Sequence, residues 1–81
     1  MQMSREEIIL KLTEVMEFTL GSEPNFTEES RLVDELGFSS VDMLYLMIAT
    51  EESFGIRFEN VGVMDLVTVG SVIDYIEARL K

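Results

Sequence analysis

Two adjacent serines, Ser39 and Ser40, are the residues of this chain whose types and position best fit covalent chemistry. They stand in the stretch "ELGFSSVDMLYLMIATEESFG", directly before an apolar run with the length of a helix. One serine is explained by capping, because a helix start needs one hydroxyl to accept hydrogen bonds from first-turn amides. If Ser39 caps, Asp42 falls at the third helical position, which favours a negative charge. Ser40 is then an ordinary first helical residue or a hydroxyl free for modification; alternatively, Ser40 is the cap and Ser39 belongs to the loop.

Catalytic side chains of the usual kinds are missing. The chain contains no cysteine and no histidine, which excludes disulfides, thiolate zinc sites and a cysteine nucleophile, and removes the commonest general base. An enzyme that used carboxylates such as Asp34, Glu35 and Asp42 would need an acid and a base positioned in a dry cleft, whereas we expect these groups to be solvated. We therefore expect a protein without catalytic residues or a metal site.

Charge restricts the partners of this chain. Its formal net charge is −10, from 16 acidic and 6 basic residues, and Arg31 is the only basic residue between Thr13 and Ile56. An acidic surface keeps a small protein soluble, but it also repels nucleic acids and anionic membranes. We expect no nucleic-acid partner, and protein partners that present lysine and arginine.

Length and hydropathy indicate one small domain, residues 1–81, acting as a monomer. The N-terminal sequence "MQMSREEIILKL" becomes charged before any long apolar run, unlike a secretory signal. No stretch approaches the roughly 20 apolar residues that span a bilayer. These features predict a cytoplasmic protein without membrane insertion.

Hydrophobic periodicity predicts an all-α fold with three main helices, one short helix and a long first loop. The first helix should run from Arg5 to Leu20, capped by Ser4 with Glu7 and stopped by Gly21; the second should run from Ser40 to Phe54, stopped by Gly55. "IRFEN" is predicted as loop and "VGVMDL" as one helical turn, followed by a last helix that Thr68 caps, with an apolar stripe of Val69, Val72, Ile73, Ile76 and Leu80. The first loop, Gly21 to Ser39, should lie on the core through Phe26, Leu32, Val33, Leu36 and Phe38.

The second helix is apolar almost all round, although one core needs only one stripe. Its core stripe would be Met43, Leu46, Met47, Thr50 and Phe54, which leaves a second stripe of Val41, Leu44, Tyr45, Ile48 and Glu52. An exposed apolar stripe favours a docking surface. The alternative is a crowded core that surrounds the helix.

The chain resembles the acyl carrier proteins of fatty-acid and polyketide synthesis over nearly its whole length. The likeness rests on "ELGFSSVDMLYLMIATEESFGI" and on "TVGSVIDYIEARL", which is similar to the last helix of that family. The matching positions of the first motif are Leu36, Gly37, Ser40, Asp42, Glu51, Glu52, Phe54, Gly55 and Ile56. The resemblance implies a four-helix bundle of the acyl-carrier type.

The resemblance also implies a function that the residues alone leave open. Ser40 would carry 4′-phosphopantetheine, which a phosphopantetheinyl transferase moves from coenzyme A, and the thiol of this arm would hold acyl groups as thioesters. Synthase enzymes with basic docking patches would be the partners. The residues expected to bind them are Val41, Asp42, Leu44, Tyr45, Ile48, Glu51 and Glu52.

Three departures from the family pattern indicate a specialised carrier with dedicated partners. Ser39 replaces the aspartate before the modified serine, Tyr45 replaces a glutamate, and "RFENVGVMDL" is less acidic than the corresponding family segment. The loss of charge at Ser39 also leaves a second hypothesis, a helical adaptor of the same fold without the prosthetic group.

Methionine content raises a question about cargo. Four of the six methionines, Met16, Met43, Met47 and Met64, are predicted at core positions. Methionine fills irregular gaps adaptably. A core of this kind could open to shelter an acyl chain, and the alternative is ordinary packing.

Overall fold

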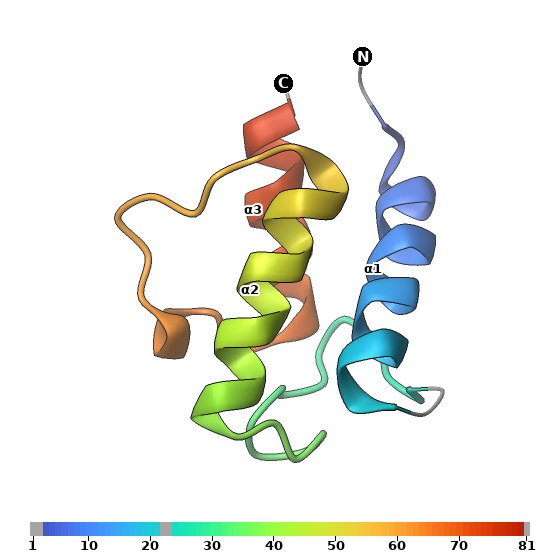
Figure 1. The fold of residues 1–81 in the computed structure, drawn as a ribbon. Helices are drawn as coiled ribbons and strands as arrows, with labels where there is room; N and C mark the ends of the chain where they lie inside the picture. The colour runs from blue at the N-terminus through green and yellow to red at the C-terminus, as the bar shows by residue number, and fades with distance from the viewer. Residues whose placement is uncertain (1–2, 22–23, 81) are drawn as a thin grey trace.

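The computed structural model describes residues 3–21 and 24–80. The regular elements of this part of the chain are helices, joined by loops. Its elements are α1 (Arg5–Leu20), α2 (Ser40–Phe54), the 3-10 turn η1 (Val63–Asp65) and α3 (Val69–Leu80) (Figure 1). The all-α prediction with three main helices is confirmed. The fourth, short helix is a single turn of three residues. None of the described helices has the length and apolar character needed to cross a membrane.

The ends of α1 follow local chemistry, as predicted. The hydroxyl of Ser4 accepts a hydrogen bond from the Glu7 amide at 3.1 Å, and the Glu7 carboxylate accepts one from the Ser4 amide at 2.8 Å. These two hydrogen bonds lower the pKa of Glu7. At the other end Gly21 adopts a left-handed φ of 76°, and its amide donates to the Glu17 carbonyl. Gly55 ends α2 in the same way.

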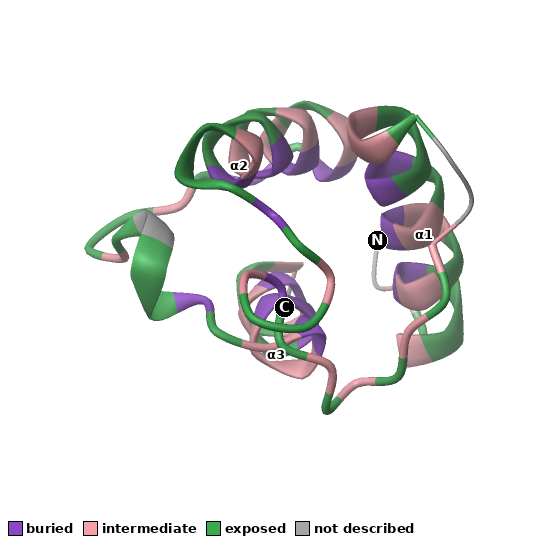
Figure 2. Ribbon diagram, turned by 90° about the horizontal axis from the view of Figure 1, so that it is seen from below, coloured by how far each residue is buried: buried purple, intermediate pink, exposed green. Residues whose placement is uncertain are grey.

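The core lies where the three helices face one another. Figure 2 shows the buried surface of each helix turned toward the interior, and α1 packs against both α2 and α3. The first loop contributes as predicted, because Leu32 and Phe38 are buried and Phe26, Val33 and Leu36 are half-buried. The buried apolar residues of the helices are Ile8, Leu12, Val15, Met16, Met43, Leu46, Phe54, Val69, Val72, Ile73 and Ile76.

Methionine placement corrects one prediction. Met16 and Met43 are fully buried and Met47 is partly buried, but the Met64 side chain is 60% exposed. The prediction of Met64 as a core residue is therefore wrong. The reason is that η1 is a short surface turn, from which Leu66, the residue after its end, enters the core instead.

The first loop is paired with the segment that enters α3. The Leu32 amide donates to the Val67 carbonyl at 2.9 Å, and the Val69 amide donates to the Ser30 carbonyl at 3.0 Å. Thr68 caps α3 as predicted, since its hydroxyl accepts from the Ser71 amide at 3.1 Å. The loop thus crosses the base of α3 as a short backbone ladder.

The connection after α2 is held by side chains from both neighbouring helices. It is loop, as predicted for "IRFEN". The carboxylate of Glu51 accepts from the Phe58 amide at 2.8 Å, and the hydroxyl of Tyr75 accepts from the Glu59 amide at 2.8 Å. The rings of Phe58 and Tyr75 stack with centroids 4.8 Å apart. These contacts tie the loop to α2 and α3.

An ion-pair cluster joins α1, the first loop and α3. The guanidinium of Arg5 lies 2.5 Å from the Glu28 carboxylate, 3.1 Å from Asp74 and 2.7 Å from Glu77. The hydrogen bond to Glu28 raises the pKa of Arg5 and lowers that of Glu28. Arg5 is therefore charged at every working pH, and the cluster depends on its carboxylates.

We predict that Glu28→Gln destabilises the fold at neutral pH and has little effect in acid. Because Arg5 depresses the folded-state pKa of Glu28 below 4.5, the stabilisation is present above that value and is lost as the pH falls through the folded-state pKa. Urea unfolding of parent and variant should give different midpoints at pH 7 and a smaller difference at an acidic pH below the usual range of glutamate. The matched control is Glu29→Gln, at an exposed neighbouring position. A gap between parent and Glu28→Gln of equal size at both pH values would contradict the prediction.

Candidate functional site

The start of α2 is capped by Ser39 and Asp42 in a reciprocal pair. The Ser39 hydroxyl accepts from the Asp42 amide at 3.1 Å, and the Asp42 carboxylate accepts from the Ser39 amide at 3.0 Å. This confirms the predicted cap. The alternative in which Ser40 caps the helix is wrong, because Ser40 is already the first helical residue.

Ser40 presents its hydroxyl to solvent at the positive end of α2. The residue is exposed, and within residues 3–21 and 24–80 its hydroxyl makes no hydrogen bond to another protein group. The Asp42 amide is occupied by the cap, whereas the amides of Ser40 and Val41 lie in the first turn, where a helix has no internal acceptors. Such a terminus favours a bound anion, for example a phosphate. A phosphate ester on Ser40 thus fits the local geometry.

The residues before the cap explain why Ser40 reaches the surface at this point. Gly37 has a left-handed φ of 77°, which glycine adopts without steric cost. Phe38 is 1% exposed, and its amide donates to the Leu32 carbonyl at 3.0 Å. A buried anchor two residues before Ser40 fixes the entry to α2, and the chain then emerges into solvent.

The second stripe of α2 is exposed. The side chains of Val41, Leu44, Tyr45 and Ile48 are 58%, 50%, 61% and 45% exposed. The alternative of a crowded core around the whole helix is therefore wrong. The core stripe is buried as predicted, with Met47 only partly covered.

The acidic residues of α2 differ in their exposure and in their hydrogen bonds. Glu52 is exposed, whereas Asp42 and Glu51 are half-buried. Asp42 takes part in the cap, and Glu51 holds the Phe58 amide of the following loop. Sequence reasoning missed this task of Glu51, since the hydrogen bond depends on how the loop folds back over the helix end.

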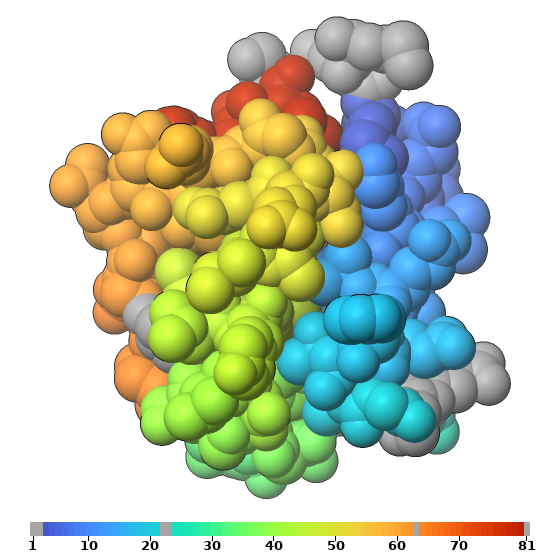
Figure 3. All heavy atoms as spheres, in the orientation of Figure 1, coloured from blue at the N-terminus to red at the C-terminus, as the bar shows by residue number. Residues whose placement is uncertain are grey.

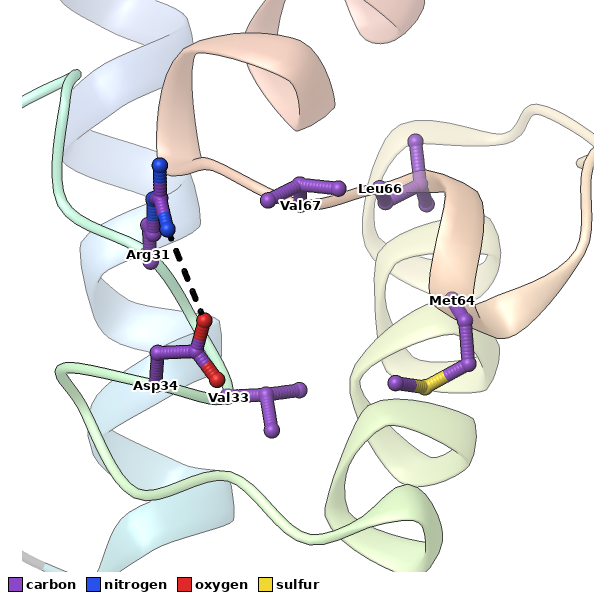
Figure 4. Close-up of a pocket in the computed structure, with 6 residues that line it drawn as sticks. All are labelled: Arg31, Val33, Asp34, Met64, Leu66 and Val67. Carbon is purple, nitrogen blue, oxygen red and sulfur yellow. Dashed lines mark ion pairs between the residues drawn. The ribbon is translucent and has the colours of Figure 1, made fainter.

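A pocket opens where the first loop meets η1. Its volume is about 160 Å³, and Figure 4 shows its lining residues from both segments. Arg31 and Asp34 form an ion pair of 3.7 Å on the loop side. The apolar lining is Val33, Met64, Leu66 and Val67. Of these, sequence reasoning singled out Val33 and Met64 as packing residues; the pairing of the loop with the entry to α3 adds the other two.

The carboxylates considered for catalysis are engaged in local contacts. Asp34 and Glu35 are exposed, and each is engaged with Arg31, through the ion pair and through the Arg31 amide at 2.9 Å. Within the described ranges no group of three or more acidic side chains could hold a metal ion. Asp42, the third of these residues, is half-buried and takes part in the cap of α2.

Comparison with known proteins identifies the family. The family model described as "Phosphopantetheine attachment site" matches residues 7–76. This chain belongs to the acyl carrier protein family. The carrier is 37% identical over 78 residues to the acyl carrier protein of Thermotoga maritima, covering 95% of this chain and 96% of that protein. The prosthetic group of the family is 4′-phosphopantetheine.

Other relatives include both general and specialised carriers. The carrier is 35% identical to the acyl carrier protein of Acidothermus cellulolyticus, over 94% of this chain and 92% of that protein. It is also 35% identical to the meromycolate extension acyl carrier protein of Mycobacterium leprae, over 95% of this chain and 68% of that protein. The resemblance stated from the sequence is therefore confirmed.

Alanine substitutions of the two serines should have different effects on the stability of the fold. We predict that Ser39→Ala lowers the free energy of unfolding of the carrier by about 0.5–2 kcal/mol, because the first turn of α2 loses its cap. Ser40→Ala should change it by less than about 0.5 kcal/mol, because the Ser40 hydroxyl makes no hydrogen bond within the described part of the chain. Urea unfolding measures both. Equal losses in the two variants would contradict the assignment of Ser39 as the cap.

Proposed function

We propose that Ser40 is the attachment site for 4′-phosphopantetheine, and that the protein carries acyl groups between fatty-acid, polyketide or related biosynthetic enzymes. The observation that supports this most directly is the division between the two serines. Ser39 is committed to the cap, whereas the Ser40 hydroxyl is exposed at a helix terminus that favours an anion. The proposal includes a monomeric carrier domain that works in the cytoplasm.

Attachment requires an enzyme, because the carrier cannot activate its own serine. A serine nucleophile needs an adjacent base, and the chain contains no histidine. The base and the magnesium ion must come from the transferase. The oxygen of Ser40 would form a new ester bond to the pantetheine-bearing phosphorus of coenzyme A while the bond from that phosphorus to the bridging diphosphate oxygen breaks. The hydroxyl proton would pass to that base, and adenosine bisphosphate would leave with the bridging oxygen. When bound, the group supplies a thiol that this cysteine-free chain lacks and that holds acyl groups as thioesters.

The exposed stripe of α2 is the proposed docking face for the transferase and for the synthase enzymes. Val41, Leu44, Tyr45 and Ile48 supply apolar contacts, and Glu52 supplies an exposed negative charge for basic patches on those enzymes. Asp42 and Glu51 contribute charge from positions that are also structural. Because Tyr45 replaces a charge by an aromatic ring, the face favours dedicated partners.

Intact-protein mass spectrometry tests the attachment site. After incubation with coenzyme A, magnesium and a broad-specificity phosphopantetheinyl transferase, we expect the parent and Ser39→Ala to gain one phosphopantetheine and Ser40→Ala to gain none. Retention of the full gain in Ser40→Ala would overturn the assignment.

A parent protein that gains nothing would point to Ser39, where the family pattern has aspartate. Repeating the reaction with Ser39→Asp then separates two cases. Restored loading means a carrier that needs its own transferase, and continued failure supports the adaptor without a prosthetic group.

The pocket of Figure 4 is the proposed shelter for the acyl cargo. Its lining is largely apolar, and Met64, an exposed residue of this lining, can adapt to the shape of a chain. We predict that the methyl resonance of Met64 shifts when the carrier is loaded with an octanoyl group. Loading with acetyl is the matched control, because the attachment is the same and only the chain length differs. Identical Met64 resonances in the two loaded forms would mean that the cargo stays outside this pocket.

A further inference from the structure

Phe18 is an aromatic residue that the fold does not use. It lies in the last turn of α1 and is 88% exposed, more than any other large apolar side chain in the described part of the chain. Leu10, also on α1, is 67% exposed. A single exposed apolar residue is ordinary on a protein surface. The surroundings of Phe18 are what distinguish it from Leu10.

A groove separates the end of α1 from the middle of α2. One hollow, of about 300 Å³, lies between Phe18 and Thr19 of α1 and Tyr45, Ile48 and Ala49 of α2. A neighbouring hollow, of about 290 Å³, is shared by Phe18, Ala49 and Ser53, among other residues. Figure 3 looks onto the seam where these two helices meet. We call the two hollows together the α1–α2 groove.

The spacing of the groove matches that of a helix. Tyr45 lines the first hollow, Ser53 lines the second and Ala49 lines both. Successive members of this set are four residues apart on α2, so the hollows follow one another along the helix by about one turn, roughly 5–6 Å. A partner helix repeats its own side chains at the same interval. Two apolar side chains one turn apart on such a helix would enter both hollows, each of which Phe18 lines.

The charged residues around the α1–α2 groove indicate which charge a partner helix should carry. Glu14 and Glu52 line the second hollow, and Glu17 lines a third hollow that also touches Phe18. Lys11, the basic residue among the lining side chains of the second hollow, has its ammonium 5.3 Å from the centroid of the Phe54 ring. The rim is therefore acidic. A second copy of this chain would bring like charges together, because its net charge is −10.

We propose that the α1–α2 groove binds a basic amphipathic helix of an enzyme that acts on this carrier, with Phe18 as its anchor on α1. The inference rests on the proposed carrier function and extends the docking surface beyond the α2 stripe onto α1. Leucine-like side chains of the partner would fill the hollows, while its lysines and arginines would reach Glu14, Glu17 and Glu52.

A synthetic peptide tests this surface on the full chain. The probe is a helical peptide of about 16 residues with leucines one turn apart, flanked by lysine and arginine. Titrated into the ¹⁵N-labelled, unmodified protein, it should produce saturable amide shifts at Phe18, Thr19, Ile48 and Ala49. A peptide with glutamate in place of the basic residues should produce none.

Matched variants of α1 decide whether Phe18 is the anchor. We expect Phe18→Ala to weaken peptide binding about tenfold, the size typical of a buried aromatic contact in an interface. Leu10→Ala should leave binding unchanged, since Leu10 lines none of the three hollows around Phe18. Both variants should unfold at the parent temperature, because the side chains are exposed in the free protein.

Three results would overturn the proposal. They are the absence of saturable shifts in the parent, equal affinity of the parent and Phe18→Ala, and a concentration-dependent dimer that Phe18→Ala abolishes, which would make a second copy the occupant. The test is separate from that of the attachment site. Ser40→Ala should bind the peptide as well as the parent does, whether or not Ser40 accepts phosphopantetheine.

Discussion

The backbone pairing between the first loop and the entry to α3 is the constraint on which the rest of the structure depends. A loop without its own helix must still satisfy its polar backbone, and the hydrogen bonds of Leu32 to Val67 and of Val69 to Ser30 do so. The same pairing carries Leu32 and Phe38 into the core. Because Phe38 stands two residues before Ser40, the base of α3 determines where α2 begins and where its free hydroxyl emerges.

This arrangement leaves α2 with two faces of different use. The buried face completes a core that α1 and α3 otherwise enclose. Each fully buried large apolar side chain, such as a leucine or a methionine, contributes about 1.5–3 kcal/mol to the stability of the fold. A chain of 81 residues has too little interior to cover the other face as well. The exposed stripe around Leu44 and Tyr45 forgoes that stabilisation in the free protein. Contact with a partner would supply it, which is why an apolar helix face suits a protein that must bind several enzymes in turn.

The features that the sequence predicts well are those that local interactions determine. The bounds of α1 and α2, their glycine stops and the Ser39 cap depend on groups three or four residues apart, so the printed residues contain the information. The roles of Tyr75 and Glu51 depend on contacts between residues that lie further apart in the sequence. The hydroxyl of Tyr75 bonds backbone groups of Arg57 and Glu59, 18 and 16 residues away, and no periodic pattern encodes that meeting. The sequence does not predict the position of Phe18 beside a groove, because a helix pattern indicates which residues share a face but not whether a neighbouring helix lies beside them.

The serine at position 39 changes how an enzyme would read the surface around Ser40. Ser39 caps the helix as an aspartate would, but it carries no negative charge. The nearby carboxylate of Asp42 accepts a hydrogen bond from the Ser39 amide. Glu51 is likewise engaged, by the Phe58 amide. Of the three acids of α2, Glu52 alone is exposed. Close to Ser40 a partner therefore meets apolar groups and shape, while the free negative charge lies toward the far end of α2 and on α1. Exposed negative charge and exposed apolar surface are thus displaced from one another along the same helix.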